Sequence, residues 1–222
     1  MIPALINKRD NFEVIRDEIA AILVLESANQ QELAAADPSK DSNDWKLRVF
    51  TERSNPWEQF LNKQDDKSPL VNVWYDNSNF DPTASNAVER QKSETVFNID
   101  CYGYGVSSDV PAGGHKAGDQ EAALTVQRAV KLVRNILMAG EYTYLGLRGT
   151  VWSRWPQSIT VFQPEIEGRQ IQQVVGARLA LRVEFNEFSP QVQAVELELV
   201  SVDVKRAEDG EIVAEADYEY PL

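Results

Sequence analysis

The chain has 222 residues and a formal net charge of −13, and its 43% apolar and 26% charged residues are typical of a globular protein with one large domain or one domain with extensions. The negative charge argues against tight, phosphate-driven binding of nucleic acids, and the single cysteine excludes an internal disulfide and a cysteine-cluster metal site. No apolar run is long enough to span a bilayer and the first ten residues lack the apolar segment of a signal peptide, so we expect a protein made and kept in a cytoplasm.

The first predicted element is a helix that begins near Phe12, with Asp10 or Asn11 as its cap. Its buried face is predicted from apolar residues that recur at helical spacing: Phe12, Ile15, Ile19, Ile22 and Leu23. The opposite face is predicted to be polar. Asp37-Pro38 ends the helix, because the residue before a proline avoids the helical conformation.

Three strands are predicted in the first half of the chain, at residues 45–50, 70–75 and 94–106. The polar segment 76–92 is predicted to be a long loop, and long loops in compact domains are usually functional or mobile. A second loop, rich in glycine and serine, is predicted at residues 107–118.

A second helix, with Asp119 as its N-terminal cap and Gly140 as its C-terminal stop, is the clearest helix of the sequence. Its buried face is predicted to consist of Ala122, Val126, Ala129, Val130, Val133, Ile136 and Leu137. After it, Pro156 separates two extended pieces, and the alternation of apolar and polar residues at 177–185 gives the strongest strand signal.

The last part of the chain reads as a hairpin. Two strand-like runs, 195–204 and 212–218, flank Asp209-Gly210, and such a dipeptide between two strands favours a tight hairpin turn. We therefore predict an α+β fold: a mainly antiparallel β-sheet with two main helices packed on one face, plus a C-terminal β-hairpin arm. The domain would span residues 1–190, with an insert at about 29–68, and the hairpin extension would span 191–222.

No pattern of catalytic residues stands out. Cys101 lies in a strand and is expected to be a buried thiol, and His115 is expected to be exposed in a glycine-rich loop. Asp100, Glu165 and Glu167 could form a carboxylate pair, but solvated side chains are the default in so acidic a chain. The glycine-rich segments lack the spacing of a nucleotide-binding loop. We expect no catalytic site, no cofactor and no metal.

Candidate interface residues come from two segments. In the first, Trp152, Arg154 and Trp155 could stack on bases or sugars, but they are predicted instead to pack in a strand or to contact a protein, since Trp and Arg are favoured interface anchors. The second segment is the hairpin, with Val202, Val204, Ile212 and Tyr218. The hairpin either reaches onto an adjacent subunit or extends its own sheet, and the sequence leaves both open.

The block 93–190 resembles the tail terminator proteins of long-tailed bacteriophages. The residues that carry the resemblance are 95–105 (TVFNIDCYGYG), Gly118-Asp119 leading into Ala122-Ala123, 128–137, 175–181 (VGARLAL), 183–187 (VEFNE) and Ser189-Pro190. The early helix and the strand at 70–75 match the expected order of elements.

The resemblance implies a structural virion protein of the neck, at the head-proximal end of the tail, assembled in the host cytoplasm. Such proteins form a hexameric ring that caps the tail tube, ends tube polymerisation and provides the joint to the head-side connector, while genomic DNA passes through the lumen. In a contractile tail the ring would also meet the last sheath ring. The insert at about 29–68 and the arm after Pro190 are additions to the smaller family members and could suit sheath or collar contacts.

Three rival functions stay open. A head–tail connector or neck protein of the same joint would also form rings, and its copy number and position on the virion would differ. A tube or baseplate protein would polymerise into long tubes. An enzyme, such as a hydrolase with dispersed acidic residues, would lose its activity when one of a few carboxylates is replaced.

Overall fold

The computed structural model describes residues 5, 7–62, 67–80, 90–110, 114–166, 169–170, 173–188, 199–205 and 212–219. The chain divides into two compact units, residues 1–189 and residues 190–222. The first unit holds the helices and the main sheet. In the second, β10 (Leu199–Lys205) and β11 (Ile212–Glu219) pair antiparallel as the predicted hairpin.

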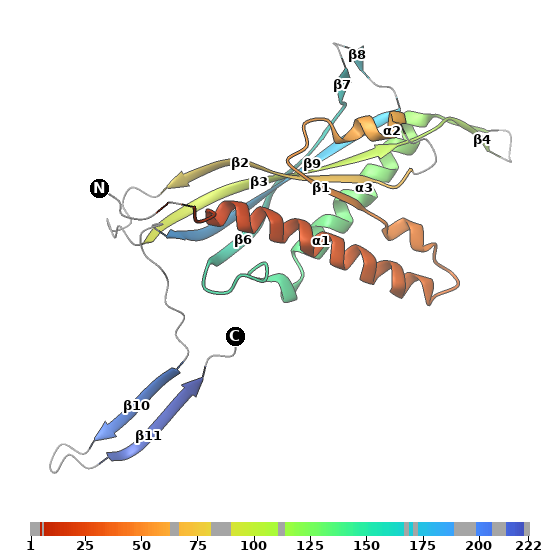
Figure 1. Cartoon of the computed structure of the whole chain (residues 1–222). Coiled ribbons are helices and arrows are strands. Elements are labelled where there is room, and N and C mark those ends of the chain that lie inside the picture. The colour runs from red at the N-terminus through yellow and green to blue at the C-terminus, as the bar shows by residue number, and fades with distance from the viewer. Residues whose placement is uncertain are drawn as a thin grey trace. The chain divides into compact units, whose positions relative to one another are not determined.

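A five-stranded sheet forms the centre of the first unit, in the order β1-β2-β3-β9-β6 (Figure 1). Its strands are β1 (Arg48–Thr51), β2 (Leu70–Phe80), β3 (Arg90–Tyr104), β6 (Val151–Phe162) and β9 (Val174–Phe188). Only β1 and β2 pair in parallel, and every other neighbouring pair is antiparallel. The longest ladder joins β3 to β9, with Phe97 opposite Leu181.

Two helices, α1 (Asn11–Ala35) and α3 (Gly118–Leu137), cover one face of this sheet. Their predicted apolar faces form the core together with alternate residues of the strands, and only Phe12 of the predicted set is partly exposed. The inward residues of β9 are the ones that the alternation predicts: Ala177, Leu179, Leu181, Val183 and Phe185. The predicted α+β fold is therefore confirmed.

Short elements fill the connections. They are η1 (Ser42–Trp45), η2 (Pro56–Glu58), α2 (Gln59–Asn62), β4 (Ser108–Val110), β5 (Gly114–Lys116), η3 (Gly140–Tyr142), β7 (Glu165–Ile166) and β8 (Arg169–Gln170). The pairs β4–β5 and β7–β8 form small hairpins in segments that the sequence predicts to be loops. Trp45 ends η1 instead of starting a strand.

The predicted loop 76–92 is wrong at both of its ends. β2 continues to Phe80 and β3 begins at Arg90, and Phe80 pairs with Ser93. The strand persists through polar residues because the facing strand supplies the backbone hydrogen bonds, and the hydroxyls of Ser78 and Thr95 also bond across the pair at 2.5 Å. Residues 81–89 lie outside the described residues.

Two glycines let α3 approach β3 closely. A Cβ on Gly103 would lie 2.5 Å from the carbonyl oxygen of Ala122, and one on Gly105 would lie 2.1 Å from that of Gly118. Both contacts are with backbone atoms, which cannot move aside as a side chain could. The sequence Tyr102-Gly103-Tyr104-Gly105 therefore packs the start of α3 on the end of the strand.

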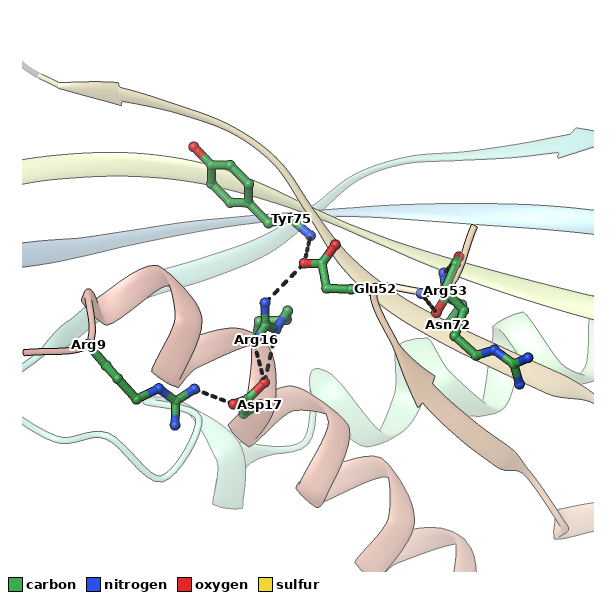
Figure 2. A network of polar contacts seen from close by, with 7 residues as sticks. All are labelled: Arg9, Arg16, Asp17, Glu52, Arg53, Asn72 and Tyr75. Carbon is green, nitrogen blue, oxygen red and sulfur yellow. Dashed lines mark hydrogen bonds and ion pairs between the residues drawn. The ribbon is translucent and has the colours of Figure 1, made fainter. Parts of the chain in front are cut away.

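A polar network ties α1 to the sheet (Figure 2). Arg16 contacts Asp17 at 2.8 Å and Glu52 at 3.2 Å, and Glu52 accepts the backbone N–H of Tyr75 at 3.0 Å. Burial raises the pKa of Asp17, but its bonds to Arg9 and Arg16 outweigh that effect and leave the pKa below its usual value. The network fixes the first half of α1 over β1 and β2.

Candidate interaction surfaces

Strand β6 forms one edge of the sheet. Among the described residues it pairs only with β9, and its register shifts at Val151/Ser153 and at Pro156/Ser158. From Ser158 to Phe162 the register is regular. The strand contains no Asp or Glu, although the chain as a whole carries a net charge of −13.

Large apolar side chains are exposed along this strand. Trp152 is 56% exposed, Ile159 47% and Val161 56%. Trp152 also lines an open hollow of about 650 Å³ together with Tyr144, Arg148, Gly149 and Val151. An aromatic side chain beside a hollow, on an edge strand, is typical of a protein interface.

Arg154, predicted as an interface residue, is engaged inside the fold. Its guanidinium donates hydrogen bonds to the carbonyl oxygens of Leu137 at 2.5 Å, Ala139 at 2.7 Å and Thr143 at 2.9 Å. It thereby binds the last carbonyl group of α3 and two carbonyl groups of the turn that follows the helix. Burial lowers the pKa of this arginine. Its main role is to fasten β6 to the end of the helix.

Trp155 lies on the sheet face away from the helices. The guanidinium of Arg182, the residue paired with it on β9, lies 5.1 Å from the ring centroid. Arg182 also forms an ion pair with Glu94 of β3. Trp155 therefore lies over the face of the sheet, whereas Trp152 lies at its edge.

The four hairpin residues occupy defined register positions. Val202 pairs with Ala216 and Val204 lies opposite Ala214. Ile212 pairs with Lys205 next to a register shift, and Tyr218 pairs with Val200. The structure thus gathers these residues in one hairpin, in a unit separate from Trp152, Arg154 and Trp155.

The outer sheet face carries a compact polar cluster around Asp100. Its carboxylate accepts two hydrogen bonds from Arg178, at 2.7 and 3.0 Å, and one from the indole N–H of Trp74 at 3.0 Å. The Arg178 guanidinium lies 4.7 Å from the Trp74 ring centroid. The hydrogen bond to Asp100 raises the pKa of Arg178, so the guanidinium keeps its charge at high pH. A carboxylate held in this way is suited to structure rather than to proton transfer.

A hollow of about 310 Å³ adjoins this cluster. Asn72 lies beside it and fixes the chain at Arg53, accepting the Arg53 N–H at 3.1 Å and donating to its carbonyl oxygen at 2.8 Å. Because the polar groups of Asn72 and Asp100 bond to neighbours in the chain, the hollow presents mainly side chains that are already engaged.

The other titratable residues singled out in the sequence are scattered. Cys101 is fully buried in the core, and burial raises the pKa of its thiol. His115 lies in β5, exposed, with Nδ1 3.3 Å from the Asp109 carboxylate. Glu165 lies in β7, and Glu167 is outside the described residues. Within the described ranges no group of three or more His, Cys, Asp or Glu side chains is placed to hold a metal ion, and no helix is long and apolar enough to cross a membrane.

A second apolar surface lies on α1, and the sequence prediction of a polar outer face missed it. Val24 is 55% exposed and Leu25 63%, and Ala21 and Ala28 are exposed one turn before and after them. We call these four residues the α1 stripe. The signal was present in the sequence, because a helix with apolar residues on all sides is typically covered on both faces.

A comparison with models of known protein families finds no match to this chain, and a comparison with curated proteins finds none either.

Proposed function

We propose that this protein is a non-catalytic structural subunit of a bacteriophage tail, a terminator that caps the tail tube as a hexameric ring. The observation that carries the proposal is the presence of two separate apolar surfaces, the α1 stripe and the edge strand β6. Soluble monomers seldom leave such patches uncovered. The resemblance of residues 93–190 to tail terminators supplies the identity of the assembly.

A closed ring requires subunits that have two different contact surfaces. Each subunit must present one surface to the neighbour on one side and a different surface to the other, and a ring that sits in a stack needs further contacts above and below. Strand β6 offers an open edge with Trp152, Ile159 and Val161 for a contact along the ring. The α1 stripe is then available to the tail tube, to the head-side connector or, in a contractile tail, to the sheath.

The acidic character of the chain is compatible with a ring through which DNA passes. DNA in transit through the lumen must not be held, and a protein with 35 acidic and 22 basic residues lacks the cation excess that binds phosphates tightly. No cofactor takes part in this function. The polar cluster around Asp100 contributes stability to the sheet instead of chemistry.

A capping assay tests the proposal. Tail tube protein from the same phage genome is polymerised with and without this chain, and tube lengths are measured by electron microscopy. We expect shorter tubes that carry a ring at one end. A tube-length distribution that does not change would contradict the terminator role, and a ring that binds only a preformed terminator would indicate the connector function.

The control is a conservative substitution on the same strand. Trp152→Glu places a negative charge on the exposed edge of β6. Because this edge is the proposed contact between subunits of the ring, the variant should abolish capping. Ser158→Thr is a conservative change at an exposed position of β6 and should leave capping intact.

A further inference from the structure

We propose that the C-terminal hairpin β10–β11 of each copy pairs with the edge strand β6 of the neighbouring copy, so that the sheet of one subunit is extended by two strands of the next. This inference rests on the proposed ring and names the contact that would close it. It identifies the occupant of the β6 edge as residues 199–219 of a second copy.

The acceptor is the regular half of β6. The sheet has two terminal strands, and the other one, β1, has only four residues. In the first half of β6, Pro156 has no N–H to donate, and the two register shifts disturb the ladder. Residues 158–162 keep regular pairing with β9, and no other described strand pairs with their second edge, which is therefore the proposed site for a new strand.

The donor is a hairpin that forms a unit of its own. β10 has seven residues and β11 has eight, which is enough to pair along the whole regular half of β6. An isolated two-stranded hairpin is marginally stable in water, and a further strand or a covering layer is needed to stabilise it. Pairing with an established sheet supplies that strand.

The register of the hairpin gives it one apolar side. Val200, Val202 and Val204 lie opposite Tyr218, Ala216 and Ala214, and residues at alternating positions of a strand share a face. Beside β6, this row would continue the exposed row of Ile159 and Val161. Joining the two apolar rows side by side buries the apolar surface at which they meet.

Charge favours the same acceptor. Residues 190–222 contain nine acidic and two basic residues, and the register sets Asp203 opposite Glu215, a like-charge pair that destabilises a hairpin. Strand β6 has no acidic residue and therefore adds no repulsion. At the other edge, Glu52 directly follows β1.

The length of the connector sets how far the hairpin can extend from its own sheet. Ten residues, 189–198, connect β9 to β10, and a fully extended chain of that length spans at most about 35 Å. Pairing with the β6 strand of the same copy would close that edge and leave the subunit without the lateral contact that a ring requires. The arm is therefore assigned to the next subunit.

Cross-linking tests the assignment. In a full-length Cys101→Ala background, one preparation carries Thr160→Cys on β6 and a second carries Ser201→Cys on β10, because both positions alternate with the apolar rows and would share the other face of the extended sheet. The two are mixed, left to assemble and treated with a short bismaleimide. We expect a covalent dimer that contains one chain of each kind, and in the double variant a ladder that extends to six chains.

The control replaces Thr160→Cys by Glu32→Cys, an exposed position on α1. Mixed dimers at equal yield with this control, or a double variant that cross-links only within single chains, would overturn the inference. Electron micrographs of the same samples separate the two proposals. Rings without the Thr160–Ser201 mixed dimer refute the arm assignment alone, whereas the mixed dimer without rings supports the arm contact and refutes the ring function.

Discussion

The carboxylate of Glu52 accepts the backbone N–H of Tyr75 at 3.0 Å, at the point where β2 shifts its register against β3 between Tyr75 and Asn77. The N–H of Tyr75 points towards the β1 side of β2, where β1 ends at Thr51 opposite Val73, and Glu52 supplies its acceptor from just beyond that end (Figure 2). Glu52 adopts a φ of 52°, which is unfavourable for a residue with a side chain. The contacts of its carboxylate with Tyr75 and Arg16 offset that cost.

Glu52→Ala tests this role. The variant removes the acceptor and the partner of Arg16 but keeps the unfavourable backbone conformation, so we expect a loss of about 1–3 kcal/mol in the free energy of unfolding. Glu52→Gln keeps an acceptor and should lose about half as much or less. Urea denaturation followed by circular dichroism measures both, and equal stability of Glu52→Ala and the parent chain would refute the role.

Gly105→Ala should be among the most damaging small changes in the chain. The added methyl group would meet backbone atoms of Gly118 and Ala122 at 2.1 and 2.6 Å, so α3 must move away from β3, and we expect a loss of about 3 kcal/mol or more. Gly140→Ala is the matched control, because nothing lies within 4 Å of its Cβ position. A thermal melt that shows similar midpoints for the two variants would contradict this packing.

The pair Tyr142–Glu26 gives a pH signature. The Tyr142 hydroxyl donates to Glu26 at 2.6 Å, which raises the pKa of the tyrosine from 10.0 to about 12 and lowers the pKa of Glu26 below 4.5. The tyrosine contribution to stability is complete below pH 10 and is lost as the pH rises towards 12. The glutamate contribution is complete above pH 4.5 and is lost as the pH falls through its lowered pKa.

The stability difference between the parent chain and Tyr142→Phe should therefore be largest between pH 5 and 10 and vanish at both extremes. Chemical denaturation at a series of pH values measures it. Because both side chains are partly solvated, we expect a difference of about 1 kcal/mol or less. A difference that is constant across the whole series would show that the hydrogen bond does not contribute.

Deletion of the residues after Pro190 should leave a folded core and weaken ring formation. The first unit contains the five-stranded sheet, both helices and the hydrophobic core, so its melting should remain cooperative. We expect a shift from ring to monomer in sedimentation velocity at equal concentration. Rings of unchanged abundance would show that the arm has no part in assembly.

The sequence predicts the elements that bury apolar residues at a regular period. The faces of α1 and α3 around Ile15, Ile19 and Val126 are found as expected, and so is the alternation from Ala177 to Phe185. This success has a physical reason, since burial of one face is what stabilises such elements. The sequence prediction also succeeds for the fold class, but it fails for the edges of the sheet.

Features that depend on distant partners were missed. Asn77 and Asn79 look like loop residues, but pairing with Val96 and Glu94 keeps them in a strand. Arg154 looks like an exposed anchor, but carbonyl groups at the end of α3 bind it. No local pattern reveals either partner. The same limit applies to the candidate interface, where Trp152 is exposed but the Arg154 guanidinium is bound within the fold.

The most direct test of the central claim is the mass and symmetry of the purified full-length protein. Mass photometry and negative-stain electron microscopy should show closed sixfold rings, in which six copies of the 25.0 kDa chain give about 150 kDa. Trp152→Glu should shift this population to smaller species without unfolding the chain. A protein that stays monomeric at every concentration and salt condition, or that forms open-ended tubes, would contradict the account.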